Sequence, residues 1–132
     1  MSTSTVSDII QQYSDEPYVD AEQIEMLTMV DEEDSGGGLV AELFGLFKSE
    51  SDPKLDQLAE ICASNDSAQL RKIVHFIAGS AGNIGLNQLS LALRRVEEGI
   101  DSGEIEDITG AEDPIRNVYE RSCSYMVENH GV

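Results

Sequence analysis

The sequence predicts an all-α protein, an antiparallel up-down-up-down four-helix bundle with an additional N-terminal helix. Apolar residues recur at helical spacing in every segment that has a readable period, and no segment alternates as a β-strand does. Helix-capping and turn-forming residues separate these segments by mostly short connections. Apolar residues make up 40% of the 132 residues, which is enough for one hydrophobic core. These observations together favour helices packed on helices.

We expect the bundle domain to cover residues 20–132, after a partly ordered N-terminal segment of residues 1–19. A short helix is possible around Val6–Ile10, and Pro17 interrupts it. The chain shows no internal repeat and no second domain.

The first bundle-associated helix is expected at about 21–31, with Asp20 as its N-cap. The acidic run 31–34 and the glycines 36–38 then end it. Its inward face is expected to contain Ile24, Leu27 and either Val30 or Met29.

Residues 38–63 form either one kinked helix or two helices. Asp52–Pro53 suggests a restart, because proline suits the first helical turn. The segment 64–66 is a turn that caps the next helix. The apolar stripe of 38–63 consists of Leu39, Val40, Leu43, Phe44, Phe47, Leu55, Leu58, Ala59 and Cys62.

Three more helices complete the predicted bundle. The first covers about 67–84, and Gly85 separates it from the second, at about 86–99. A loop rich in Gly, Asp and Glu covers 100–112, and Asp113–Pro114 begins the last helix. The inner face of the last helix is expected to consist of Ile115, Val118, Tyr119, Ser122 and Met126.

The formal net charge of −18 excludes several classes of function. No basic stripe is available to neutralise phosphates, so nucleic acid is not an expected partner, and an anionic membrane surface is equally unfavourable. No apolar run approaches the roughly 20 residues that span a bilayer. Residues 1–15 lack the basic and apolar regions of a signal peptide. We therefore expect a soluble cytoplasmic protein.

The cysteines and histidines do not have metal-ligand spacing. Cys62 and Cys123 occupy apolar helix faces and form no CxxC motif, so two free buried thiols are expected, although a disulfide stays open. A metal or redox protein using His75, His130 and the cysteines is disfavoured, because no two ligands fall three or four residues apart. His130 lies in a C-terminal tail that we expect to fray. We predict no metal site.

His75 is the most informative residue, because it lies off the apolar stripe of its helix. That stripe consists of Leu70, Ile73, Val74, Ile77, Ala81 and Ile84. Arg71 and Lys72 lie one turn before His75. Small residues follow it on the same side: Ala78, Gly79 and Gly82. An exposed imidazole with cations behind it and little bulk in front is accessible to a second protein.

Gly79 and Gly82 stand inside the helix, where each costs about 1 kcal/mol relative to alanine. Close helix packing is one explanation. The other is an open approach to His75, since a large residue at 79 would lean back over the imidazole. The shared position of both glycines beside His75 favours the open approach.

The segment 75–85, followed by Leu89, Leu93 and Val96–Glu97, resembles the histidine phosphotransfer (HPt) domain signature. That signature reads roughly H-x-L-K-G-S-[SA]-x-x-[LI]-G-x-x-x-L, with a hydrophobic-Glu pair about a helix later. The resemblance implies a phosphorelay role, in which His75 accepts a phosphoryl group from a receiver-domain aspartate and passes it to another receiver. It also implies that Gly79 keeps the approach open.

The resemblance also implies the partners and the cofactors. The partners would be receiver domains of response regulators or of a hybrid sensor histidine kinase, with no small-molecule substrate. The chain would need no cofactor, because Mg²⁺ belongs to the receiver. The chain has no P-loop and no kinase Gly-rich loop, so we expect a phosphoryl carrier and not an enzyme with ATP-dependent kinase activity.

The chain departs from the family pattern at Ala78, where a lysine is usual. A cation there would hold phosphoryl oxygens, and we expect Arg71 or Lys72 to substitute for it. The departure leaves an alternative open, a pseudo-HPt adaptor that docks receivers without efficient transfer. Ala78, Gly79 and Gly82 are then docking positions.

Further docking contacts are expected from Phe76 on the flank of the His75 helix, and from Met26 and Met29 on the early helix. A hydrolase that uses His75 as general base is the remaining alternative. It is disfavoured, because no Ser or Cys nucleophile shares the face of His75 and we expect no acidic residue beside it.

Overall fold

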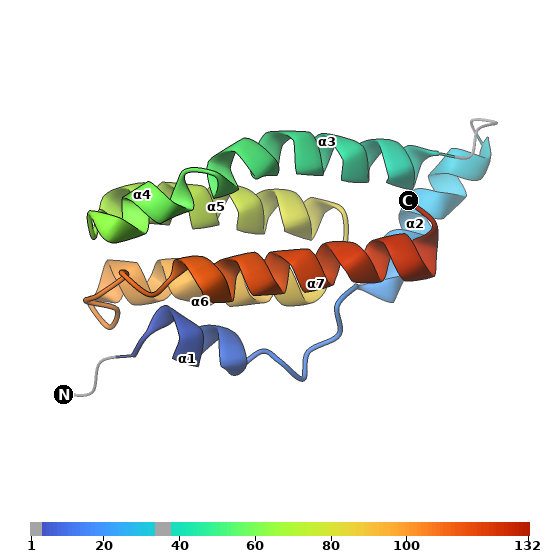
Figure 1. Ribbon diagram of the computed structural model, residues 1–132. Helices are drawn as coiled ribbons and strands as arrows, with labels where there is room; N and C mark the ends of the chain where they lie inside the picture. The colour runs from blue at the N-terminus through green and yellow to red at the C-terminus, as the bar shows by residue number, and fades with distance from the viewer. Residues whose placement is uncertain (1–3, 34–37) are drawn as a thin grey trace.

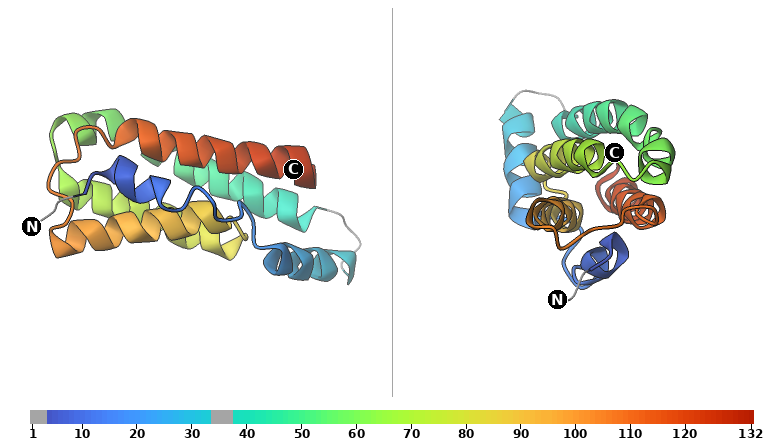
Figure 2. Two further views of the ribbon diagram at one scale, coloured as in Figure 1. Left: turned by 90° about the horizontal axis from the view of Figure 1, so that it is seen from below. Right: turned by 90° about the vertical axis from the view of Figure 1, so that its left-hand side faces the viewer.

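The computed structural model describes residues 4–33 and 38–132, and every regular element in these ranges is a helix (Figure 1). The seven helices of these ranges are α1 (Val6–Gln11), α2 (Ala21–Glu33), α3 (Leu39–Leu55), α4 (Leu58–Ala63), α5 (Ser67–Asn83), α6 (Asn87–Ser102) and α7 (Glu112–His130). Viewed end-on, α3 with α4, α5, α6 and α7 surround one core (Figure 2). The predicted antiparallel bundle is therefore confirmed.

The apolar stripes of α5 and α6 face this core. The predicted α5 stripe, from Leu70 to Ile84, is buried throughout. Four apolar side chains of α6 and the residue before it are fully buried as well: Leu86, Leu89, Leu93 and Val96. Burying a side chain of this size contributes about 1.5–3 kcal/mol, so this pair of stripes is a large part of the fold's stability.

The first helix, α1, packs against α6 and α7 (Figure 2). Its N-terminus is a capping box, in which Thr5 Oγ1 accepts from the Asp8 backbone N–H and the Asp8 carboxylate accepts from the Thr5 N–H. Val6, Ile9 and Ile10 are buried in the common core. The short helix predicted around 6–10 is confirmed.

The second helix, α2, extends past the end of the α5–α6 pair (Figure 2). Its first turns cover the core: Ile24 is buried, and Gln23 Nε2 donates to the Asn83 carbonyl at 3.0 Å. Met29 lies further out and is 59% exposed, so of the two alternatives for the third inward position, Val30 and Met29, the structure excludes Met29. The predictions for the Val30 side chain and for residues 34–37 lie outside the described part of the chain.

The segment 38–63 contains two helices, but their junction differs from the prediction. α3 continues through Pro53 and ends at Leu55. Asp52 does not cap a new helix, because its carboxylate instead accepts a hydrogen bond from the Tyr119 hydroxyl at 2.8 Å. Within the predicted stripe, Ala59 is exposed, because the junction at 56–57 turns α4 relative to α3.

The last two helices are longer than predicted. α6 ends at Ser102, and Gly103 then adopts φ +81°, a left-handed conformation that favours glycine at a helix end. α7 runs through His130, so the prediction of a frayed tail at His130 is wrong. Asn129 Nδ2 donates to the Tyr125 carbonyl at 3.0 Å inside the last turn. The predicted inner face of α7 is buried throughout.

Cys62 and Cys123 are buried free thiols, as predicted. Burial raises the pKa of Cys123 to about 11, so its thiol stays protonated at neutral pH.

Candidate functional site

His75 lies near the middle of α5, on the side away from the core. Asp66 caps the N-terminus of this helix, because its carboxylate accepts a hydrogen bond from the Gln69 backbone N–H at 3.2 Å. The buried stripe then fixes the rotation of α5, and this rotation leaves the His75 side chain 69% exposed.

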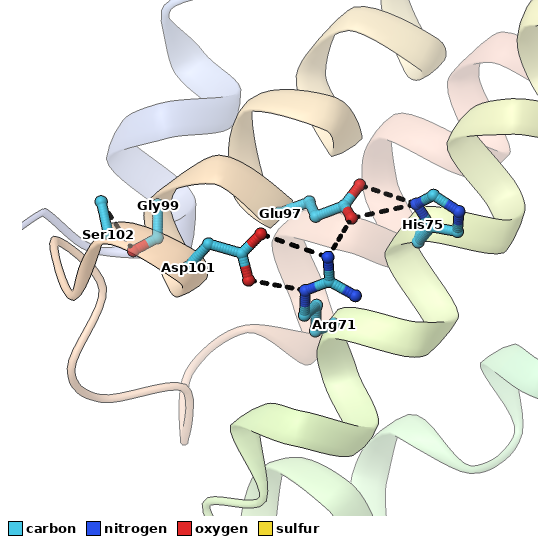
Figure 3. Close-up of polar contacts among 6 residues, drawn as sticks. All are labelled: Arg71, His75, Glu97, Gly99, Asp101 and Ser102. Atoms are coloured by element: carbon cyan, nitrogen blue, oxygen red, sulfur yellow. Dashed lines mark hydrogen bonds and ion pairs between the residues drawn. The ribbon is translucent and has the colours of Figure 1, made fainter.

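Glu97 of α6 holds the imidazole (Figure 3). His75 Nδ1 lies 3.0 Å from Oε1 and 3.0 Å from Oε2 of Glu97. A carboxylate only accepts hydrogen bonds, so this contact assigns the proton to Nδ1. The second ring nitrogen, Nε2, therefore keeps its lone pair, and the side chain that carries it is exposed to solvent.

Arg71 holds Glu97 in turn. Its guanidinium lies 3.0 Å from Glu97 Oε2 and makes two hydrogen bonds to Asp101, of 2.6 Å and 3.2 Å (Figure 3). The hydrogen bond from Arg71 lowers the pKa of the Asp101 carboxyl. The Arg71–Asp101 pair is exposed, so we assign it a positioning role and little stability.

The contacts between α5 and α6 follow one antiparallel register. Arg71 and Asp101 each stand 15 residues from Leu86 along the chain, and His75 and Glu97 each stand 11 residues from it. Residues at equal distance from Leu86 therefore oppose each other across the two helices.

An open groove of about 520 Å³ lies beside His75, between α5 and α6. The described residues that line it are His75, Ala78, Gly79, Arg94, Glu97, Glu98 and Asp101. The groove thus combines an exposed nitrogen nucleophile, an ordered carboxylate and small residues on α5.

A family model for the Hpt domain matches residues 42–123, which is more than half of the chain. The chain belongs to the Hpt domain family. No curated protein and no solved structure matches it. Hpt domains are phosphocarrier modules of two-component signalling, so the chain has a phosphotransfer-related role and interacts with receiver domains. Within the described ranges, no helix has both the length and the apolar character needed to cross a bilayer.

Gly79 and Gly82, the two glycines beside His75 in this Hpt domain, differ in their surroundings. A Cβ added at Gly79 would meet nothing within 4 Å. A Cβ at Gly82 would lie 3.0 Å from Arg94 Nη2 and 3.1 Å from Ser90 Oγ. Gly79 is therefore bare surface, whereas Gly82 allows close contact with α6.

The two cations proposed from the sequence lie on opposite flanks of His75. Measured around the helix axis from His75, Arg71 is rotated by about 40° toward α6, and Lys72 by about 60° in the opposite direction. Arg71 is engaged by two carboxylates, and Lys72 is exposed. The structure brings Arg71 to His75 through Glu97, and Lys72 takes no part in that network.

The remaining predicted positions lie around this centre. Ala78 is only 1% exposed, at the floor of the groove. Phe76 is half-buried, and Lys54 Nζ lies 4.5 Å from its ring centroid. Met26 is 63% exposed on α2.

Sequence reasoning missed the role of Glu97 and the presence of Arg94 and Asp101 in the groove. The expectation that no acidic residue lies beside His75 is wrong, because Glu97 contacts its ring. Glu97 is 22 residues from His75 in the chain. The hydrophobic-Glu pair of the family signature was the one signal that pointed to it.

Proposed function

We propose that this Hpt domain carries a phosphoryl group on His75 Nε2, taken from the aspartate of one receiver domain and delivered to that of another. The observation that supports it is the contact of Nδ1 with Glu97, which leaves Nε2 as the free nitrogen of an exposed ring. The receiver domain of a hybrid sensor kinase fits this chemistry, and so do the receiver domains of response regulators.

The forward step exchanges one bond to phosphorus for another. The Nε2 lone pair attacks the phosphorus of an aspartyl phosphate in line, the Nε2–P bond forms, and the P–O bond to the aspartate breaks. The aspartate leaves as a carboxylate. The Nδ1 proton stays on the ring, which becomes positively charged, and Glu97 stabilises that charge at 3.0 Å. Delivery to the second receiver is the reverse of this step.

The partner supplies the rest of the charge stabilisation. A receiver's acidic pocket holds Mg²⁺ next to its aspartate, so this chain needs no metal of its own. The chain is thus a carrier of phosphoryl groups, and the source of the phosphoryl group is the partner.

The surface around His75 suits docking of a second protein. Gly79 leaves open space beside the imidazole. Met26 and Met29 add exposed apolar side chains on α2, which continues the α5–α6 layer past its end (Figure 2). We propose that a receiver contacts Gly79 and α2 together, with Phe76 at the edge of the contact.

One observation favours a second candidate function, a pseudo-Hpt adaptor that binds receivers without efficient transfer. The family's usual lysine is replaced by Ala78, and that position is buried here. An adaptor predicts receiver binding that does not depend on phosphate.

The deciding experiment is phosphorylation by a small phosphoramidate donor, read by intact mass and phosphorus NMR. We expect wild type and His130→Ala to gain about 80 Da as one acid-labile phosphoryl group, and His75→Ala to gain none. A folded wild-type chain that takes no phosphate, yet binds receivers, would reject the carrier and support the adaptor. Phosphate that persists in His75→Ala would place the site elsewhere.

A further inference from the structure

The groove beside His75 is lined by more negative than positive charge. Three carboxylates line it, from Glu97, Glu98 and Asp101, whereas Arg94 is the one cation among the described lining residues. A phosphoryl group adds up to two more negative charges. A carrier at this site needs a cation that offsets this repulsion.

Arg94 stands opposite position 78. Ala78 and Arg94 are each eight residues from Leu86, so the α5–α6 register that pairs His75 with Glu97 also places these two residues at one level. This level lies one turn beyond Glu97, about 4.5 Å along the helix axis. Ser90 Oγ donates to the Ala78 carbonyl at 2.9 Å, which fixes α6 against α5 at this point.

The small residues of α5 make room for the Arg94 side chain. Its Nη2 lies 3.0 Å from the point where a Cβ of residue 82 would be, so only glycine at 82 permits this position without a shift. Ala78, one turn earlier, lies at the floor of the same groove. A longer side chain at 78 would take up space in the groove that Ala78 and Arg94 both line.

Arg94 is also available for a new anion. Among the side chains that the structure describes, those of residues 4–29 and 38–132, no carboxylate lies within ion-pair distance of the Arg94 guanidinium, and the Arg94 side chain is exposed. By contrast, Arg71 is engaged by Glu97 and Asp101. Lys72 is on the flank away from α6, as helical geometry places it.

We propose that Arg94 binds the phosphoryl oxygens on His75 Nε2, and so provides from α6 the cation that the family usually provides from a lysine at position 78. This inference rests on the proposed carrier function. In this proposal, the small residues Ala78 and Gly82 leave room for a cation that comes from α6. The chain can then transfer phosphoryl groups efficiently without the family's lysine at position 78.

The test compares Arg94→Ala, Arg94→Lys and a matched control, Arg121→Ala, which removes one exposed arginine from α7. Loss of a charge-assisted hydrogen bond should slow phosphorylation of His75 by phosphoramidate about 10- to 100-fold in Arg94→Ala. Arg94→Lys should recover most of the rate, and Arg121→Ala should match wild type. The phosphorus NMR shift of phosphohistidine should change in Arg94→Ala and not in Arg121→Ala.

A direct spectroscopic signature is the Arg94 Nε–H resonance, which should shift on phosphorylation of the wild-type chain. The double variant Ala78→Lys with Arg94→Ala returns the cation to the family position and should restore the rate. Arg94→Gln keeps a polar, partly aliphatic side chain without the charge, so it repeats the comparison if Arg94→Ala does not fold.

Two results overturn the inference, and they are distinguishable. If wild type takes phosphate on His75, and both Arg94→Ala and Arg94→Gln behave as Arg121→Ala does, the role of Arg94 is wrong and the carrier function stands. If folded wild type takes no phosphate, the carrier function fails and Arg94 has no phosphoryl group to bind.

Discussion

At the scale of single residues, the contact between His75 and Glu97 organises the site. The carboxylate fixes the tautomer, the orientation of the ring and the charge that forms on it, while Arg71 fixes the carboxylate. His75 was predictable from its own helix, because it breaks the apolar stripe. Glu97 was not predictable from periodicity, because its role depends on how two helices align across the hairpin. The same holds for Arg94.

The residue-scale prediction concerns Glu97. Glu97→Ala removes the acceptor of the Nδ1 proton and should lower the phosphorylation rate of His75 by about 10- to 100-fold. Glu97→Gln keeps an acceptor oxygen without the charge, so its loss should be smaller. The measurement is the initial rate with phosphoramidate and with a phosphorylated receiver. Equal rates in wild type and Glu97→Ala would contradict the assigned role.

At the scale of elements, the helices and their inward faces followed from sequence periodicity, and the exceptions have tertiary causes. Asp52 and Pro53 have the pattern of a helix start, but Tyr119 of α7 engages the Asp52 carboxylate and α3 continues. Met29 has the spacing of a buried residue, but α2 extends beyond the helices that would cover it (Figure 2). Local pattern carries no information on either circumstance.

The element-scale prediction contrasts two helical glycines. Gly79→Ala should raise the free energy of unfolding by about 0.5–1 kcal/mol, because alanine favours the helix and the space is open. Gly99→Ala should lower it by about 1 kcal/mol, because overpacking outweighs the same gain. The added Cβ would lie 2.7 Å from Ile105 Cδ1 and 3.1 Å from Ile9 Cδ1. Urea denaturation of both variants measures the two effects, and a common sign would refute the contrast.

At the scale of the whole molecule, the acidic balance is the dominant property. The chain has 26 acidic and 8 basic residues, so the folded state brings like charges together. From sequence alone, the charge makes nucleic acid an unexpected partner. The net charge does not say which carboxylates the cations meet: Arg71 pairs with Glu97 and Asp101, whereas Arg94 lines the groove beside His75, because these contacts depend on the fold.

The whole-molecule prediction follows from this self-repulsion. Raising NaCl from about 0.02 M to about 0.5 M shortens the range of electrostatic interactions and should raise the melting temperature. Thermal melts followed by circular dichroism measure it, with an uncharged osmolyte at matched osmolality as control. A melting temperature that falls with salt would mean that ion pairs, such as those of Arg71 with Asp101 and of Arg95 with Glu104, outweigh the repulsion.

The register centred on Leu86 has a consequence for how such sites change over time. One residue inserted within α6, after Leu89, would leave the motif from His75 to Ile84 intact and turn the rest of α6 by about 100° relative to α5. Arg71, His75 and Ala78 would then lose their opposite residues in a single event. The alignment of α6 against α5 therefore decides whether the site is complete. A motif search that scores only the histidine helix would accept such a chain, although its imidazole had lost its carboxylate.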